Sequence, residues 1–205
     1  RPVAEHKAIR AAVKKIESAR SPLLVVGAGA NRTMTGRMLL QFIEKTGIPF
    51  LPMSMAKGLL PDSHPQCAGA TRSLVLKESD VVMLIGARLN WLLSHGKGKT
   101  WGVQGTQKFI HIDISPTEAD SNVRIDAPVV GDIGSCVAAL LSGMDKHWPQ
   151  PPAEWLAAVA DKKDKNVAKM AETLAKDPKP MNFHSALAVV RDIVYVATQV
   201  QEGRF

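Results

Sequence analysis

The sequence predicts an α/β domain of the doubly wound type, in which helices cover both faces of a parallel sheet. Three observations predict it. Short unbroken apolar runs, typical of strands buried on both faces, recur along the chain. They alternate with helical or turn segments, as expected for parallel strands joined by crossover connections. The length of 205 residues is sufficient for one sizeable core.

The first part of the domain is expected to hold two helices and two strands. Apolar residues recur at helical spacing over residues 5–19, and SPLLVVGAGA (21–30) is an apolar strand closed by glycines. Residues 37–47 predict a helix that Gly47 ends near its C-cap. IPFLPM (48–53) predicts another strand, and its two prolines indicate a sheet edge or an abrupt end.

The second part repeats the alternation, and DVVMLIGA (80–87) is its most strongly apolar strand. The other expected elements are a turn over 57–66, a helix over 69–79, a glycine-rich loop over 94–105, strands over 108–114 and 127–133, and a helix over 134–143.

Proline clusters divide the rest of the chain. DKHWPQPP (145–152) predicts a linker, and a lysine-rich helix follows it to about residue 175. DPKP (177–180) breaks that helix, and NFHSALAVVRDI (182–193) predicts one more. We therefore expect a main domain over residues 1–145, a linker and lysine-rich helix over 146–181, and the incomplete start of a neighbouring module over 182–205.

Composition places the chain among soluble globular proteins. With 45% hydrophobic and 22% charged residues it is far from the disordered and membrane classes. No apolar run approaches the roughly 18 residues that a spanning helix needs, and RPVAEHKAIR lacks the apolar core of a secretory signal. Cys67 and Cys136 lie far apart, which indicates a reducing, cytoplasmic location without a structural disulfide or a bound metal.

The basic charge raises nucleic acid as a partner, but its distribution disfavours one. The net charge is +7 and the pI is near 9.5, and an excess of lysine and arginine attracts phosphate. Much of the excess lies in residues 160–179, where acidic residues interleave with lysine and no aromatic residue is spaced for base stacking. A solvated helix face is the favoured interpretation.

The turn GAGANR (27–32) follows the first strand, where a doubly wound fold exposes backbone N–H groups to an anion. Gly27 and Gly29 match the dinucleotide-binding fingerprint, but Arg32 stands at its third glycine position. Phosphate binding and a tight strand-to-helix turn are equally good interpretations of this stretch.

Three polar residues mark the ends of later strands. Asp113 ends the strand in HIDIS, Asp132 ends the one in VGDIG, and Arg88 follows the strand at 80–87. Carboxylates at such positions can bind ribose hydroxyls or cap the next helix, and capping is the better interpretation for Asp132. A guanidinium on the same edge can hold a phosphate through two hydrogen bonds.

Catalytic signatures are absent from the sequence. His64 and His95 lie in turns without a recognisable acid or nucleophile partner, and there is no paired-carboxylate, phosphate-loop or zinc motif. The chain therefore resembles a binding module without chemistry of its own. A free-standing NAD-dependent dehydrogenase is disfavoured by the broken fingerprint.

Four stretches resemble one enzyme family. These are TGIPFLPMSMAKGLLPDSHPQ (46–66), SDVVMLIGARLNWLLSHGKGKTW (79–101), FIHIDISPTEADSN (109–122) and APVVGDIGS (127–135). They are similar to the central domain of the oxalyl-CoA decarboxylases and 2-hydroxyacyl-CoA lyases, which are thiamine-diphosphate enzymes. The resemblance covers roughly residues 5–193, and GARLNWLL with MAKGLLPD is its most specific part.

The resemblance implies a homo-oligomeric parent enzyme with three α/β domains, of which this chain supplies the Rossmann-like central one. Flanking domains would hold thiamine diphosphate and Mg²⁺, and the parent would cleave a carbon–carbon bond of an acyl-CoA. For an oxalyl-CoA decarboxylase the products are formyl-CoA and CO₂, a step of oxalate catabolism; a 2-hydroxyacyl-CoA lyase is the alternative parent. The parent would be cytoplasmic, or peroxisomal in a eukaryote.

The resemblance also assigns ligands to the central domain. It would bind the nucleotide part of coenzyme A and, in oxalyl-CoA decarboxylases, ADP as an activator. By position, Ala87, Arg88 and Asn90 match the segment that meets the coenzyme A phosphates. The turn with Gly27 and Gly29, together with Asp113, Asp132 and Ile133, matches the lining of the ADP pocket.

Departures from the family pattern keep an alternative open. Family members usually have a lysine where this chain has Ala28, and the tail YVATQVQEGRF does not continue with their glycine- and asparagine-rich stretch. The glutamate that activates thiamine and the G-D-G metal motif are missing, so we expect this chain alone to be catalytically silent. The alternative is a structural spacer whose nucleotide pocket is empty.

Overall fold

The computed structural model describes residues 1–32, 34–120, 122–176 and 178–201. The chain divides into two compact units, Arg1–Lys162 and Lys163–Phe205. The first unit carries the sheet and every candidate residue named above. The fold of this unit therefore positions the site.

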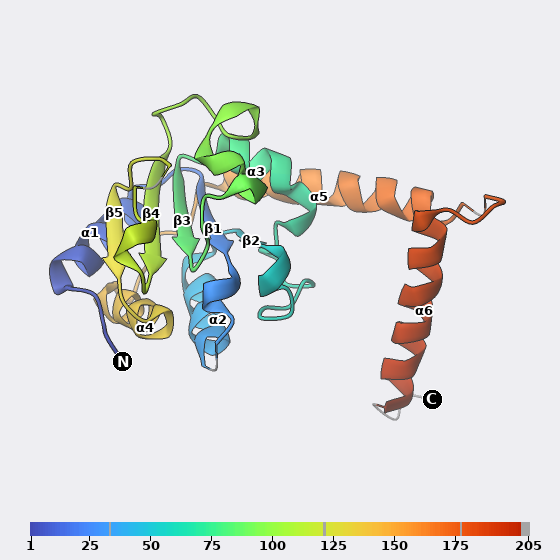
Figure 1. Cartoon of the computed structure of the whole chain (residues 1–205), viewed down its shortest axis with the longest axis horizontal. Helices are drawn as coiled ribbons and strands as arrows, with labels where there is room; N and C mark the ends of the chain where they lie inside the picture. The colour runs from blue at the N-terminus through green and yellow to red at the C-terminus, as the bar shows by residue number, and fades with distance from the viewer. Residues whose placement is uncertain (33, 121, 177, 202–205) are drawn as a thin grey trace. The chain divides into compact units, whose positions relative to one another are not determined.

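A five-stranded parallel sheet forms the centre of the first unit (Figure 1). Its strand order is β2-β1-β3-β4-β5, and β1 pairs in parallel with both β2 and β3. This order and the helices on both faces confirm the predicted doubly wound α/β fold. The strands are β1 (Pro22–Val26), β2 (Phe50–Pro52), β3 (Val81–Ile85), β4 (Lys108–Asp113) and β5 (Ala127–Val130).

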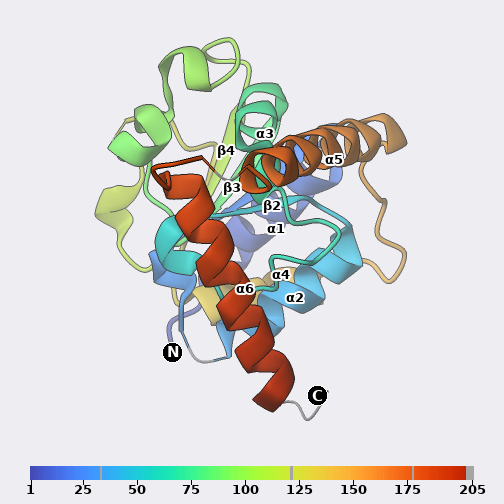
Figure 2. The ribbon, with the colours of Figure 1, turned by 90° about the vertical axis from the view of Figure 1, so that its right-hand side faces the viewer.

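Helices cover both faces of the sheet because successive strand residues point to opposite sides. Leu24 and Val26 of β1 join the apolar cluster under α1 (His6–Glu17), α2 (Thr35–Thr46) and α4 (Ile133–Gly143). The alternate residues Leu23 and Val25 join the cluster under α3 (Arg72–Glu78) and the start of α5 (Ala153–Leu174). In Figure 2, α2 and α4 lie below the strands and α3 lies above them.

The strand environments agree with the sequence patterns. Every residue of β1 and β3 is buried, as the unbroken apolar runs predicted. Edge strand β5 alternates instead, with Val129 buried and Val130 exposed, because only one of its faces is covered. Gly47 ends α2 in the left-handed conformation at φ 63°, and its N–H donates to Ile43 O at 2.8 Å, as predicted for a C-cap.

Strand β2 occupies a sheet edge, as its prolines predicted, but its outer side is not bare. A short segment after the turn at 57–66 returns alongside it. Phe50 N–H donates to Gln66 O at 2.9 Å, and Ala68 N–H donates to Phe50 O at 2.8 Å. The N–H and C=O of Phe50, which would otherwise face solvent, are thereby hydrogen-bonded.

The proline-rich segment 145–152 is attached to the first unit. Trp148 is 9% exposed and packs in the α1/α2/α4 cluster, and Gln150 Nε2 donates to Lys45 O at 3.0 Å. The start of α5 is also held, because Trp155 is buried and its Nε1 donates to Pro22 O at 3.1 Å. The first unit therefore extends through the beginning of α5 to Lys162.

The second unit contains the remainder of α5 and the helix α6 (Phe183–Gln201). Helix α6 runs beyond residue 193, where the sequence pattern ended it. Asn182 begins it, since its Oδ1 accepts the N–H of Ser185 at 2.9 Å. Many apolar side chains of α6 are exposed, including Phe183 and Ile193. Among the described residues, no helix combines the length and apolar character needed to cross a bilayer.

Candidate functional site

The carboxyl ends of all five strands face one edge of the sheet, which we call the carboxyl edge (Figure 1). After β1 the chain moves outward to β2, and it then returns to β3 on the other side of β1. The loops after β1 and β3 therefore leave in opposite directions. Such a switch point is where open α/β sheets bind ligands.

The glycine turn after β1 is in backbone contact with the end of β3. A Cβ added to Gly27 would lie 2.3 Å from Gly86 O, so only glycine fits there. The N–H of Gly27 donates to Ile85 O at 2.9 Å, and that of Gly29 donates to Gly86 O at 3.0 Å. Both N–H groups are thus used inside the fold, which favours the tight-turn interpretation of these two residues over direct phosphate binding.

Gly86 is the partner of this turn, and the sequence reasoning did not single it out. It adopts φ +57°, and a Cβ added there would lie 2.6 Å from Ala30 N and from Ile133 Cδ1. Ile133, a predicted site residue, is 6% exposed, and its Cδ1 lies beneath the turn. A glycine directly after the most apolar strand was the available signal for this contact.

The three predicted site residues in the segment after β3 lie in different environments. Ala87 is 3% exposed and packs in the core, and Asn90 Oδ1 accepts the N–H of Leu92 at 3.0 Å at the start of a 3₁₀ segment. Arg88 has a side chain that is 63% exposed, with Nε 3.3 Å from Glu118 Oε1. Arg88 therefore lies at the carboxyl edge with a carboxylate beside it. Glu118, in the loop after β4, was not anticipated.

Asp113 ends β4 as predicted and stabilises the loop that follows. Its Oδ1 accepts the N–H of Ser115 at 2.9 Å, and its side chain is 13% exposed. Its Oδ2 lies 3.9 Å from Nε2 of His111. This carboxylate therefore has one oxygen engaged with the backbone and another directed at a neighbouring imidazole.

His111 is a buried polar residue next to this edge. It is 4% exposed, and its Nε2 has no hydrogen-bond partner among the described residues. A small cavity beside it is lined also by Glu118, Asp120 and Asn122. Burial lowers the pKa of His111, while Asp113 and Glu118 oppose that shift.

Asp132 caps α4, as the sequence favoured. Its Oδ1 accepts the backbone N–H of Ser135 at 3.1 Å and the hydroxyl of Ser135 at 2.9 Å. The backbone hydrogen bond from Ser135 is the main cause that lowers the pKa of Asp132. Arg1 Nη1 lies 3.9 Å from the same oxygen. The capping role accounts for this residue without a ligand.

Arg72 is a second cation of the carboxyl edge, and sequence reasoning missed it. Its Nη2 donates to Leu92 O at 2.6 Å, and its Nη1 lies 3.4 Å from Met53 Sδ. Burial lowers the pKa of this guanidinium. Arg72 thereby connects the loops that follow β2 and β3, and its position at the start of α3 was the only sequence signal.

Large apolar side chains are exposed in the loops after the first four strands. Exposed fractions reach 74% for Trp91 and 72% for Met55. Exposed apolar surface of this kind is typical of a region that a ligand or another domain covers. The residues are Met34, Met55, Trp91, Leu92 and Ile114. Among the described residues, no cluster of histidine, cysteine and carboxylate side chains could hold a metal ion.

Comparison with known proteins identifies relatives of the chain. The model of the family described as "Thiamine pyrophosphate enzyme, central domain" matches residues 9–140. The chain is 45% identical over 188 residues to oxalyl-CoA decarboxylase of Escherichia coli K12, covering 92% of this chain and 33% of that protein. It is 37% identical over 192 residues to mouse 2-hydroxyacyl-CoA lyase 1, covering 93% and 33%.

A plant protein gives a similar result. The 2-hydroxyacyl-CoA lyase of Arabidopsis thaliana is 38% identical over 191 residues, covering 91% of this chain and 32% of that protein. The chain thus spans about a third of the length of these curated relatives. With most of its doubly wound unit matched by one family model, the chain belongs to the thiamine pyrophosphate enzymes, as their central domain.

Proposed function

We propose that this central domain binds the ADP part of coenzyme A at the carboxyl edge, within an acyl-CoA lyase that uses thiamine diphosphate. Oxalyl-CoA decarboxylase is the proposed parent, and 2-hydroxyacyl-CoA lyase is the alternative. The observation that carries the proposal is the strand order β2-β1-β3-β4-β5, because it brings the turn after β1 and the Arg88 loop after β3 together at a switch point.

Arg88 is the proposed phosphate ligand. Its side chain is largely in solvent, and its pairing with Glu118 leaves other guanidinium N–H groups to donate. A guanidinium can bind two phosphate oxygens at once, which a lysine cannot do in the same geometry. The ion pair with Glu118 would hold the guanidinium in position before the ligand arrives.

The glycine turn takes a supporting part in this proposal. The N–H groups of Gly27 and Gly29 already donate to carbonyls of the β3 end, and that of Ala30 donates to Gly27 O at 3.1 Å. Side chains would therefore contribute more to phosphate recognition than the backbone N–H groups of the glycine turn. The turn's contribution is its position, because the absent side chains let the ends of β1 and β3 meet at the switch point.

Asp113 and the exposed apolar side chains suit the rest of a nucleotide. A carboxylate at a strand end can accept hydrogen bonds from ribose hydroxyls, and Asp113 Oδ2 lies 3.9 Å from Nε2 of His111. The neighbouring Ile114 is 56% exposed and offers apolar surface for a base. Asn90, Asp132 and Ile133 would then shape the pocket, since each contacts the protein itself.

Binding the ADP part of coenzyme A, away from the reacting carbon, would position the thioester of the substrate. Interactions with remote parts of a substrate can contribute several kcal/mol to catalysis by orienting the reacting group. The proposed parent would receive its carbon–carbon bond chemistry from thiamine diphosphate and Mg²⁺, held by domains that flank this one. The part of this chain in that reaction is binding and orientation.

Calorimetry of the 205-residue chain with coenzyme A and with ADP tests the proposal. We expect Arg88→Ala to weaken both ligands about tenfold, the effect of losing a charge-assisted phosphate contact. Arg10→Ala on the exposed face of α1 is the matched control and should leave affinity unchanged. Equal affinity in wild type and Arg88→Ala would remove Arg88 from the site.

The spacer alternative is favoured by Ala28 and by the unusual tail YVATQVQEGRF. Ala28 stands where the family usually carries a lysine, and this loss bears most directly on activation by ADP. A domain that shows a cooperative thermal transition but binds neither ligand at about 5 mM would support an empty pocket. Binding of coenzyme A without ADP would support substrate anchoring alone.

A further inference from the structure

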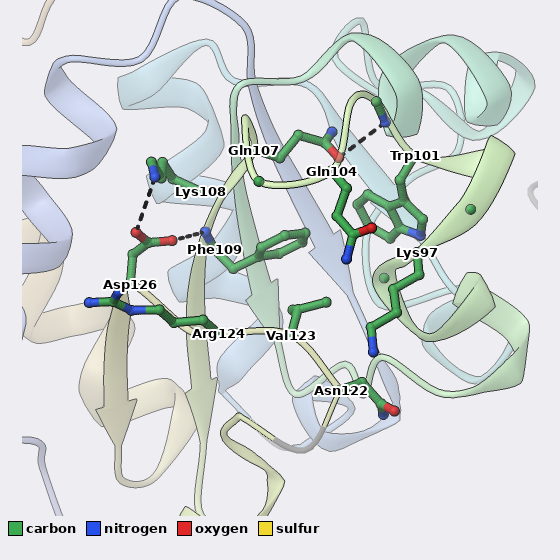
Figure 3. Close-up of a pocket in the computed structure, with 14 residues that line it drawn as sticks. Lys97, Trp101, Gln104, Gln107, Lys108, Phe109, Asn122, Val123, Arg124 and Asp126 are labelled. Atoms are coloured by element: carbon green, nitrogen blue, oxygen red, sulfur yellow. Dashed lines mark hydrogen bonds and ion pairs between the residues drawn. The ribbon is translucent and has the colours of Figure 1, made fainter.

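A second cavity lies at the opposite, amino edge of the sheet (Figure 3). Its volume is about 580 Å³, within the range of roughly 300–1,000 Å³ typical of small-molecule sites. The glycine-rich loop, the first residues of β4 and the segment before β5 line it. Lys108 of β4 is paired in register with Val81, the first residue of β3, which places the cavity away from the switch point.

The frame of this cavity is held by buried groups. Trp101 is 4% exposed, and its Nε1 donates to Leu93 O at 2.7 Å. Phe109 is also buried and packs edge-on against Trp101 at a centroid distance of 5.4 Å. Gln107 Nε2 donates to the carbonyls of Leu76 and Ser79, each at 2.8 Å. The apolar floor is therefore preformed.

Cations outnumber carboxylates around the cavity. Lys97, Lys108 and Arg124 line it, and among the described lining residues Asp126 is the one carboxylate. Asp126 is already engaged, because its Oδ2 accepts the N–H of Phe109 at 2.9 Å and its Oδ1 lies 3.8 Å from Lys108 Nζ. Within the described chain, neither Lys97 nor Arg124 has an ion-pair partner. The cavity is left electropositive.

A neighbouring cavity shows that this excess is local. It shares Trp101 and Gln107 with the cavity beside Lys97 and Arg124. In the neighbouring cavity, however, the charges of Lys77 and Lys99 are balanced by those of Glu78 and Asp80. The carboxylate of Asp80 accepts backbone N–H groups, so its role is structural. Both cavities lie at the amino edge, and only the one beside Lys97 and Arg124 carries unbalanced positive charge.

The positive charges of Lys97 and Arg124 lie at opposite ends of the cavity. In Figure 3, Lys97 reaches toward Asn122, while Arg124 extends in the opposite direction, below Asp126. The Phe109 ring, Val123 and the Gln104 amide lie between these two ends. Such a lining matches a ligand with an acid group at each end and a short apolar or neutral body between them.

We propose that this amino-edge cavity binds a small organic dianion, whose two acid groups pair with Lys97 and Arg124. The acid groups can be carboxylate or phosphate, because both present oxygens that accept from ammonium and guanidinium donors. The inference does not depend on nucleotide binding at the carboxyl edge, since neither Lys97 nor Arg124 is among the residues proposed to bind the nucleotide. It adds a second ligand site to the domain.

The test is a nitrogen-15 NMR titration of the 205-residue chain at low ionic strength with glutarate, with 3-phosphonopropionate and with acetate. We expect saturable shifts for both dianions at the amides of Gly98, Gly102 and Gly105 and at the Trp101 indole N–H, with Kd of about 1 mM or below. Acetate, with one acid group, should bind at least about tenfold more weakly. The stronger of the two dianions identifies which acid group the cavity prefers.

Two variants and two controls make the test specific. Lys97→Gln and Arg124→Gln should each weaken the dianion about tenfold; both residues are exposed, so the fold should persist. Lys99→Gln, in the same loop but lining the neighbouring cavity, and Arg88→Ala should not change affinity. Shifts that do not saturate, or a loss in Lys99→Gln equal to that in Lys97→Gln, would overturn the proposal.

Discussion

The two edges of the sheet differ in how their glycines are used. At the carboxyl edge, Gly27 and Gly86 bring two strand ends into backbone contact, and added side-chain atoms would overlap main-chain atoms. At the amino edge, Gly98 and Gly105 also have positive φ, yet a Cβ at either would meet nothing within 4 Å. Glycine thus serves packing at one edge and loop conformation at the other. The first edge should be rigid and intolerant of substitution, and the second adaptable.

The largest expected effect comes from testing that difference directly. Gly27→Val should destabilise the domain by about 3 kcal/mol or more, because the branched side chain would overlap the backbone at Gly86. Gly105→Ala should cost only about 1 kcal/mol, the strain of positive φ without a steric clash. Urea unfolding followed by circular dichroism gives both values. Similar losses in the two variants would contradict the contrast.

A smaller effect is expected at the cap of α4, which is also part of the carboxyl edge. Asp132→Ala should lower the free energy of unfolding by about 1 kcal/mol, since the N–H and hydroxyl of Ser135 lose their acceptor. Asp132→Asn keeps a capping oxygen and should lose little. If thermal denaturation showed Asn to be as damaging as Ala, the charge of Asp132, and not its cap, would be the stabilising feature.

The third effect is a loss of stability on acidification. Burial lowers the pKa of His111 in the folded state below its ordinary value of 6.5. The unfolded chain therefore binds a proton first on acidification, and stability contributed above pH 6.5 is lost progressively as pH falls toward the folded pKa. His111→Gln should flatten this part of the stability profile between pH 7.5 and 5, as measured by urea unfolding at each pH. An unchanged slope would show that His111 does not titrate in this way.

Much of the fold could be predicted because its determinants are local. Unbroken apolar runs marked β1 and β3, prolines marked the edge strand β2, and Gly47 marked the end of α2. The capping role of Asp132 was equally local, since its partner Ser135 is three residues away. These features follow from patterns within a few residues of sequence.

The unpredicted features depend on contacts between distant segments. Glu118 lies thirty residues after Arg88, and only the adjacent carboxyl ends of β3 and β4 bring the two together. Arg72 bridges two loops through backbone and sulfur atoms, which no residue pattern encodes. The amino-edge cavity likewise needs the loop at 94–105 to meet the segment before β5. The ligand roles of the eight predicted site residues stay predictions.

The covered side of β2 has a consequence for self-association in solution. An exposed edge strand promotes association because its unpaired N–H and C=O groups can form hydrogen bonds with the backbone of another molecule. Here Gln66 and Ala68 already saturate Phe50 from its outer side. Concentrated solutions of this chain should therefore resist growing filaments from that edge, and removing the return segment would create a template for them.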